Sequence, residues 1–63
     1  MKFTIFLEWN DSSSTSFEVT IEGRDHEIMS TLMWITRGTL MASSAKRSIA
    51  YNEEGFDVVS YIQ

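Results

Sequence analysis

Two segments near the start of the chain alternate residue by residue between apolar and mostly polar side chains. In residues 2–9 every second side chain is large and apolar: Phe3, Ile5, Leu7 and Trp9. In residues 15–22 the same period places three more on one face: Phe17, Val19 and Ile21. A period of two built from branched and aromatic residues predicts strands buried on one face. The chain must therefore form a sheet with one covered face.

The polar stretch 10–14 joins these segments, and its asparagine, aspartate and serines favour turns. We expect the strands to pair antiparallel around it in a register that matches their apolar residues: Leu7 opposite Phe17, Ile5 opposite Val19 and Phe3 opposite Ile21. A slip of one residue would turn a whole strand face the other way, so this register is well specified.

A helix is predicted after the second strand, because apolar residues recur there at helical spacing. They form two adjacent rows: Ile28, Leu32 and Ile35, and Met29, Met33, Thr36 and Leu40. The pattern places an amphipathic helix at about residues 25–42. Asp25, or as second choice Gly23, caps its start. Three members of the apolar rows are expected in the core: Met29, Leu32 and Met33.

The last third of the chain admits two interpretations. In the preferred one, residues 52–55 form a hairpin loop in which Gly55 takes the left-handed position. The flanking strands, at about 46–51 and 56–62, then pair with their apolar residues on one face: Tyr51 opposite Phe56 and Ile49 opposite Val58. In the other, good helix formers at residues 42–47 continue the helix or start a second one, and only the final strand remains. The fold class is α+β, with one helix on an antiparallel sheet, ββαββ or alternatively ββαβ.

The chain of 63 residues is expected to be a single domain spanning 1–63, near the lower limit for independent folding. It has no cysteine, so a disulfide and a thiolate metal site are excluded. His26 is the only histidine, and no second one follows at metal-ligand spacing. Nucleophilic catalysis needs a base beside the nucleophile, and phosphate loops need clustered glycines. Neither pattern is present, so we expect a non-enzymatic protein without cofactor or metal.

The net charge is −4, and the acids lie mainly in the two sheet-forming ends of the chain. The first 23 residues carry four of them: Glu8, Asp11, Glu18 and Glu22. The last 16 residues carry three: Glu53, Glu54 and Asp57. A sequence-independent nucleic-acid binder needs a basic stripe, and no apolar run is long enough for a membrane span. The charge instead favours a protein partner with a basic surface.

The predicted sheet face opposite the helix mixes acids with large apolar residues. Its members are Phe6, Glu8, Glu18, Glu22, Asp57, Val59 and Tyr61. Such a mixture is typical of an interface, although solvated strands also expose stray apolar residues. The same face could close a homodimer. Trp34, which projects from another side of the helix, is a second candidate contact.

Two stretches resemble the small inhibitor of host RNA polymerase made by T7-type phages: Ser16-Phe17-Glu18-Val19-Thr20-Ile21 and Gly55-Phe56-Asp57-Val58. That family is similar in length, acidity and strand–strand–helix–strand order. The resemblance implies an acidic strip that grips a basic polymerase surface. The general profile is also similar to small phage anti-CRISPR proteins, which mimic the charge of DNA.

We therefore expect a phage-encoded inhibitor in the cytoplasm of an infected bacterium. It would cover a basic nucleic-acid site on a CRISPR effector subunit or, alternatively, on RNA polymerase, without binding nucleic acid itself. A different hypothesis is a structural or assembly module that homodimerises through its sheet.

Overall fold

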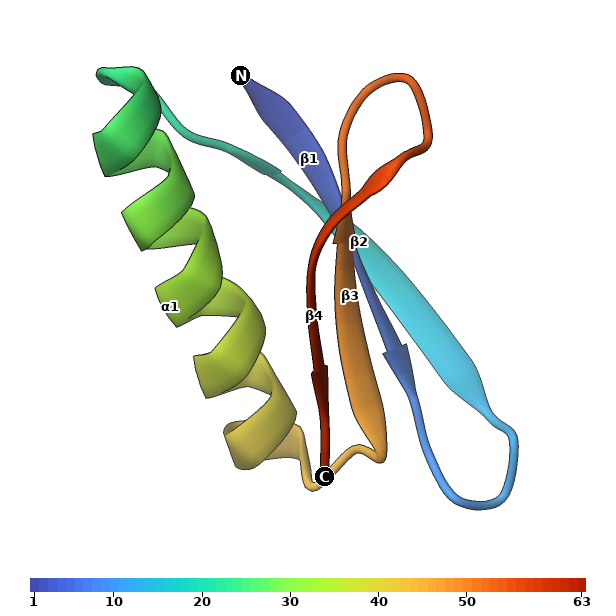
Figure 1. Ribbon diagram of the computed structural model, residues 1–63. Helices are drawn as coiled ribbons and strands as arrows, with labels where there is room; N and C mark the ends of the chain where they lie inside the picture. The colour runs from blue at the N-terminus through green and yellow to red at the C-terminus, as the bar shows by residue number, and fades with distance from the viewer.

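The computed structural model describes residues 1–63, with one helix packed on one face of a four-stranded antiparallel sheet (Figure 1). The elements in chain order are β1 (Lys2–Glu8), β2 (Ser14–Thr20), α1 (Asp25–Ser43), β3 (Arg47–Tyr51) and β4 (Asp57–Ile62). The strand order across the sheet is β2-β1-β3-β4, so the two hairpins meet where β1 pairs with β3. The predicted ββαββ arrangement is confirmed, and the ββαβ alternative is wrong.

The β1–β2 hairpin keeps the predicted faces but not the predicted register. Its observed apolar-face pairs are Phe3 with Val19, Ile5 with Phe17 and Leu7 with Thr15. The loop is two residues shorter than expected, because the Trp9 N–H donates to the Ser13 carbonyl at 2.9 Å, and the returning strand therefore begins two residues earlier. A shift of two residues leaves every side chain on its own face.

The β3–β4 hairpin corrects both the predicted pairs and the predicted faces. The Asn52 N–H donates to the Phe56 carbonyl at 2.9 Å. Asn52 therefore pairs with Phe56 in place of Tyr51, and the loop begins one residue later than predicted. A bulge between Ala50 and Tyr51 and their partners then shifts the register again, so Ile49 opposes Ser60. The residues of β3 that face the helix are therefore Ser48 and Ala50, not Ile49 and Tyr51.

The core lies between α1 and the sheet in two adjoining clusters. The larger one comprises Phe3, Ile5, Ile21, Ile28, Leu32 and Ala50, and the smaller one Leu7, Leu40 and Ala45. Two small polar residues, Thr36 and Ser48, are fully buried with them. Thr36 Oγ1 donates to the Leu32 carbonyl at 2.7 Å, which satisfies its hydroxyl within the helix. Small side chains on both elements leave room for α1 to lie close to β3.

The helix begins at the predicted residue and ends one residue beyond the predicted end. Its cap differs, because Arg24 is the N-cap and Asp25 is already helical. The Arg24 N–H donates to the Glu27 carboxylate at 3.1 Å, so the stabilising acceptor comes from the first turn. At the other end, the Trp9 indole N–H donates to the Ser43 carbonyl at 3.0 Å. This bond satisfies a carbonyl that the helix itself leaves unpaired.

Two methionines predicted in the core lie outside it. Met29 is 38% exposed and Met33 is 46% exposed, whereas Leu32 between them is fully buried. The buried stripe of α1 is a single row, Ile28, Leu32, Thr36 and Leu40. The neighbouring row lies on the flank of the helix, where Met29 and Met33 line surface hollows together with Val58 and Tyr61 of β4.

Candidate functional site

The face of the sheet opposite the helix holds only part of the predicted contact set. Phe6 is half-buried there between Ser16 of β2 and Ile49 of β3. Glu18 is exposed on the same face of β2. Tyr51 lies on this face too, opposite Thr4. The central strip of the face is therefore apolar and aromatic. Acids lie around it on three strands: Glu18 on β2, Glu8 at the end of β1 and Asp57 opposite Tyr51 on β4.

Tyr61 and Val59 were predicted on that face and lie on the other one. Tyr61 packs against the cluster that contains Leu7 and Leu40. Val59 packs against the larger core cluster. The cause is the bulge in β4, which moves the alternation by one residue between Asp57 and Val59. Asp57, exposed at the start of β4, precedes this shift.

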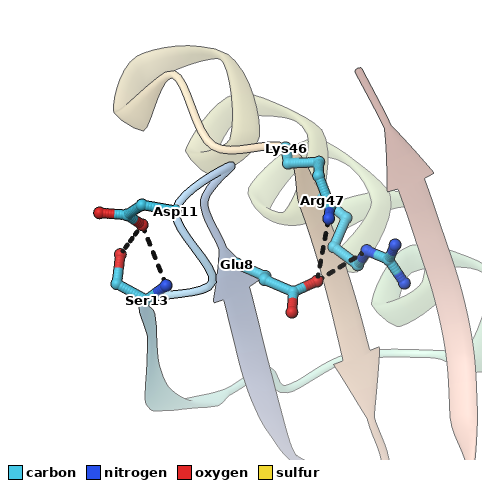
Figure 2. Close-up of polar contacts among 5 residues, drawn as sticks. All are labelled: Glu8, Asp11, Ser13, Lys46 and Arg47. Atoms are coloured by element: carbon cyan, nitrogen blue, oxygen red, sulfur yellow. Dashed lines mark hydrogen bonds and ion pairs between the residues drawn. The ribbon is translucent and has the colours of Figure 1, made fainter.

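Glu8 is engaged within the molecule (Figure 2). Its Oε1 lies 3.0 Å from Arg47 Nε and 3.9 Å from Lys46 Nζ, and both bases come from the chain entering β3. The Arg47 contact is an ion pair by distance, and its Nε–H does not make a hydrogen bond. Sequence spacing could not show this pairing, because it depends on β1 and β3 being neighbours. Glu8 is thus neutralised by its own chain.

The turn after β1 holds another carboxylate that is hydrogen-bonded within the molecule (Figure 2). Asp11 Oδ1 accepts a hydrogen bond from the Ser13 hydroxyl at 2.5 Å and one from the Ser13 N–H at 3.0 Å. These two bonds favour the charged carboxylate and hold the pKa of Asp11 below its ordinary value of 3.8. This acid stabilises its own turn.

The remaining acids, apart from Glu18, gather at one end of the molecule, which we call the acidic end. They are Glu22, Asp25, Glu27, Glu53, Glu54 and Asp57. Glu22, predicted on the sheet face, lies past the end of β2. In Figure 1 the N-terminus, the start of α1 and the β3–β4 turn all lie at this end. A shared surface hollow confirms the proximity, because Met1, Asp25 and Asn52 line it together. None of these six carboxylates forms an ion pair.

The bases at this end are few and do not neutralise it. Lys2 and Arg24 are the two basic side chains there. The amino group of Met1, which donates to the Ile21 carbonyl at 2.7 Å, adds a third positive charge. Six carboxylates therefore face three positive groups at this end. At the opposite end the side chains balance, with Glu8 and Asp11 beside Lys46 and Arg47, and the C-terminal carboxylate adds one negative charge. The net negative charge is thus concentrated at one end.

An exposed aromatic ring lies within the acidic end. Phe56, between the two glutamates of the β3–β4 turn and Asp57, is 67% exposed. The predicted four-residue loop put it in the core opposite Tyr51, and the observed loop is one residue shorter. The signal that could have found it is the pair of Asn52 and Gly55, which together favour a three-residue loop with a left-handed last residue.

Two predicted contact residues do meet, although on the helix side. A hollow of about 190 Å³ between α1 and β4 is lined by Ser30, Met33, Trp34, Arg37 and Tyr61. Trp34 is 70% exposed, which confirms that it projects away from the core. This hollow brings together an aromatic pair and one guanidinium.

The carboxylates of the acidic end spread over a surface and do not converge. No group of three or more His, Asp or Glu side chains is placed to hold a metal ion. No helix of the structure combines the length and apolar character that crossing a membrane requires. No protein-family model, curated protein or solved structure matches this chain. The arrangement is that of a charged surface that carries an exposed aromatic ring.

Proposed function

We propose that this protein is a non-enzymatic inhibitor of the phage-encoded kind, which uses its acidic end to cover a basic nucleic-acid-binding surface of a bacterial host complex. A CRISPR effector subunit is the first target to test and RNA polymerase the second. It would act in the cytoplasm of the infected cell. The observation that carries the proposal is a set of six carboxylates without an ion-pair partner at one end of the molecule, whereas the charged side chains at the other end balance.

Phe56 supports a protein partner in preference to a small cation. Exposed aromatic rings are enriched at the centres of protein interfaces, where they fill pockets of the partner. The carboxylates of Glu53, Glu54 and Asp57 surround this ring in sequence. Charged groups around such an anchor steer the encounter and select a partner of opposite charge. The acidic end therefore combines an anchor with a complementary rim.

The position of the C-terminus gives the first experiment a clean design. Gln63 lies at the end of the molecule opposite to the acidic end (Figure 1), so an affinity tag there leaves the proposed surface free. The tagged protein is used to capture partners from a bacterial lysate, which are identified by mass spectrometry. We expect a nucleic-acid-binding complex whose captured subunit carries clustered lysines and arginines. Capture of only acidic or uncharged partners would contradict the proposal.

The second experiment measures the dissociation constant of the purified pair as the salt concentration rises. Binding through exposed carboxylates weakens steeply, since salt screens such charges. Glu54→Lys at the acidic end is compared with Glu18→Lys, an equal charge change on the exposed face of β2. We expect about a tenfold loss for the first, because an attraction becomes a repulsion, and less than about twofold for the second. A dissociation constant that does not change with salt, or an equal effect of both variants, would contradict the proposal.

A further inference from the structure

The strand β2 is an edge of the sheet that carries none of the usual protection. Six of its seven residues are exposed, and the seventh, Val19, is half-buried. It contains no proline and no lysine, and its pairing with β1 is regular along its whole length. The other edge, β4, is interrupted by a bulge. Bulges, lysines and prolines keep edges from pairing with other chains, so β2 is the edge that remains open.

Two hydrogen bonds determine which backbone groups of β2 point outward. Ile21 N–H donates to the Met1 carbonyl at 2.8 Å, and Trp9 N–H donates to the Ser13 carbonyl at 2.9 Å. Hydrogen-bonded pairs alternate along an antiparallel ladder, so the odd-numbered residues of β2 bond to β1. The even-numbered ones therefore direct their N–H and C=O groups to the open edge: Ser14, Ser16, Glu18 and Thr20.

We propose that a second copy of this chain pairs with this edge, antiparallel and centred on Phe17. In this register Ser16 of one copy faces Glu18 of the second copy, and Ser14 faces Thr20. Every outward N–H and C=O of both strands then finds a partner. Registers centred on Ser16 or Glu18 leave some of these groups unpaired at the strand ends.

Charge selects the same register. Glu18 is the only charged side chain of β2. Centring on Phe17 places it opposite a serine, whereas centring on Glu18 would set the two carboxylates directly against each other, which is destabilising. The two-fold symmetry also sends the acidic ends of the two copies in opposite directions, because antiparallel strands run opposite ways. The negative ends of the two chains, each of net charge −4, are thereby held away from each other.

The pairing also covers an exposed ring. Phe17, which is 39% exposed, faces the helix side of the sheet at a strand that the helix does not cover. In the proposed dimer the two Phe17 side chains form a non-hydrogen-bonded cross-strand pair, the type in which side chains approach most closely. The two-fold axis lies perpendicular to the sheet, so both helices stay on one face of the continuous sheet that the two copies form. This inference does not depend on the proposed partner.

The test is the dimer dissociation constant, measured by sedimentation equilibrium on the full chain and two matched variants at one exposed position. In the proposed register residue 16 of each copy faces Glu18 of the other, so the dimer contains two such pairs. Ser16→Lys makes both pairs opposite in charge, and Ser16→Glu makes both pairs like in charge. We expect the first to lower the dissociation constant by about fivefold and the second to raise it by a similar factor. Weakening by both variants would indicate centring on Ser16, and no effect of either would place the interface elsewhere. Either outcome overturns the proposal.

A covalent trap tests the same geometry when the dimer is weak. The chain has no cysteine, so any disulfide must join two introduced residues. Phe17→Cys places the two sulfurs at the centre of the pairing, where they can bond, whereas Ser14→Cys places them about 20 Å apart. We expect mild oxidation to give a covalent dimer of the first variant at least about tenfold faster than of the second, since only the first pair lies within bonding reach. Equal rates for the two variants would rule the dimer out.

Discussion

The two hairpins of the sheet turn in the same way although their turn sequences differ. Each closes over a three-residue loop, residues 10–12 in one and 53–55 in the other. In each a backbone bond of 3.0 Å spans the turn, from Ser12 N–H to Trp9 O and from Gly55 N–H to Asn52 O. The last loop residue is left-handed in both, with φ of 71° at Ser12 and 87° at Gly55. One turn conformation thus serves two unrelated sequences.

The hairpins differ in the strand that leaves the turn. β2 continues in one register to its end, whereas β4 contains a bulge. Without the bulge, Ser60 would face the helix, and with it Tyr61 packs against Leu7 and Leu40. β2 does not pack directly against α1, so its register is not constrained by the helix. The turn therefore sets the starting register, and packing against α1 decides whether the strand keeps it.

The largest expected difference between the hairpins comes from the aromatic residues beside their turns. Trp9 packs against Leu7, Leu40 and Ala45 and donates to the helix end, whereas Phe56 is 67% exposed. Trp9→Ala should lower the free energy of unfolding by about 2 to 3 kcal/mol. Phe56→Ala should change it by less than about 0.5 kcal/mol. Chemical denaturation of both variants checks this, and a similar loss for each would show that the two turns are equally anchored.

The second hairpin should gain stability when a buried hydroxyl is removed. Ser48 is fully buried and its Oγ has no hydrogen-bond partner. Ser48→Ala should therefore raise the free energy of unfolding by about 1 kcal/mol, measured by chemical denaturation. Ser16→Ala, an exposed serine on the first hairpin, is the matched control and should change it little. Destabilisation by Ser48→Ala would mean that the hydroxyl has a partner in solution.

Exchanging the left-handed residues tests whether the two turns are equivalent. A residue other than glycine costs about 1 kcal/mol in this conformation. Gly55→Ser should destabilise the protein by about that amount; the new Cβ would meet no atoms within 4 Å, so backbone strain alone is tested. Ser12→Gly should stabilise it by a similar or smaller amount. Thermal unfolding of both variants gives opposite shifts if the turns share one conformation.

The smallest expected difference is a response to acid. The side-chain acceptor of the first turn is Asp11, and that of the second is Asn52, whose Oδ1 accepts from the N–H groups of Glu54 and Phe56. Since the pKa of Asp11 is lowered in the folded protein, its stabilising effect is complete above its ordinary value of 3.8. That effect is lost as the pH falls through the lowered pKa.

An NMR titration measures this response. Below pH 3.8 the amide of Ser13 should shift as Asp11 takes up a proton, while the amide of Phe56 shows no such step. Asp11→Asn should abolish the step at Ser13. A matching step at Phe56 would show that a carboxylate of the second turn takes part as well.

The elements could be predicted from sequence because each has a local period. The helix at Asp25–Ser43 and the four strands agree with spacing alone. The registers could not be predicted, because they depend on Ser12 adopting a left-handed conformation and on a bulge beside Val58 that no residue pattern marks. The predicted face of Tyr61 was wrong for that reason.

The candidate site could be predicted only in the sign of its charge. The excess of acids is a property of composition, but the acidic end exists because the start of α1, the N-terminus and the β3–β4 turn meet in space. Glu8 does not serve as a free contact residue, because it pairs with Arg47, a residue 39 positions later in the sequence. Such encounters are decided by strand order.

The strand order β2-β1-β3-β4 also bears on biosynthesis. Each hairpin can form as soon as its own residues leave the ribosome, because its contacts are local. The ladder between β1 and β3 joins residues on either side of the helix, such as Leu7 and Ser48, and must wait until β3 has been made. Long-range pairing of this kind is the slow part of folding. Until then β1 has a second open edge, and the emerging chain is most vulnerable to aggregation through its first strand.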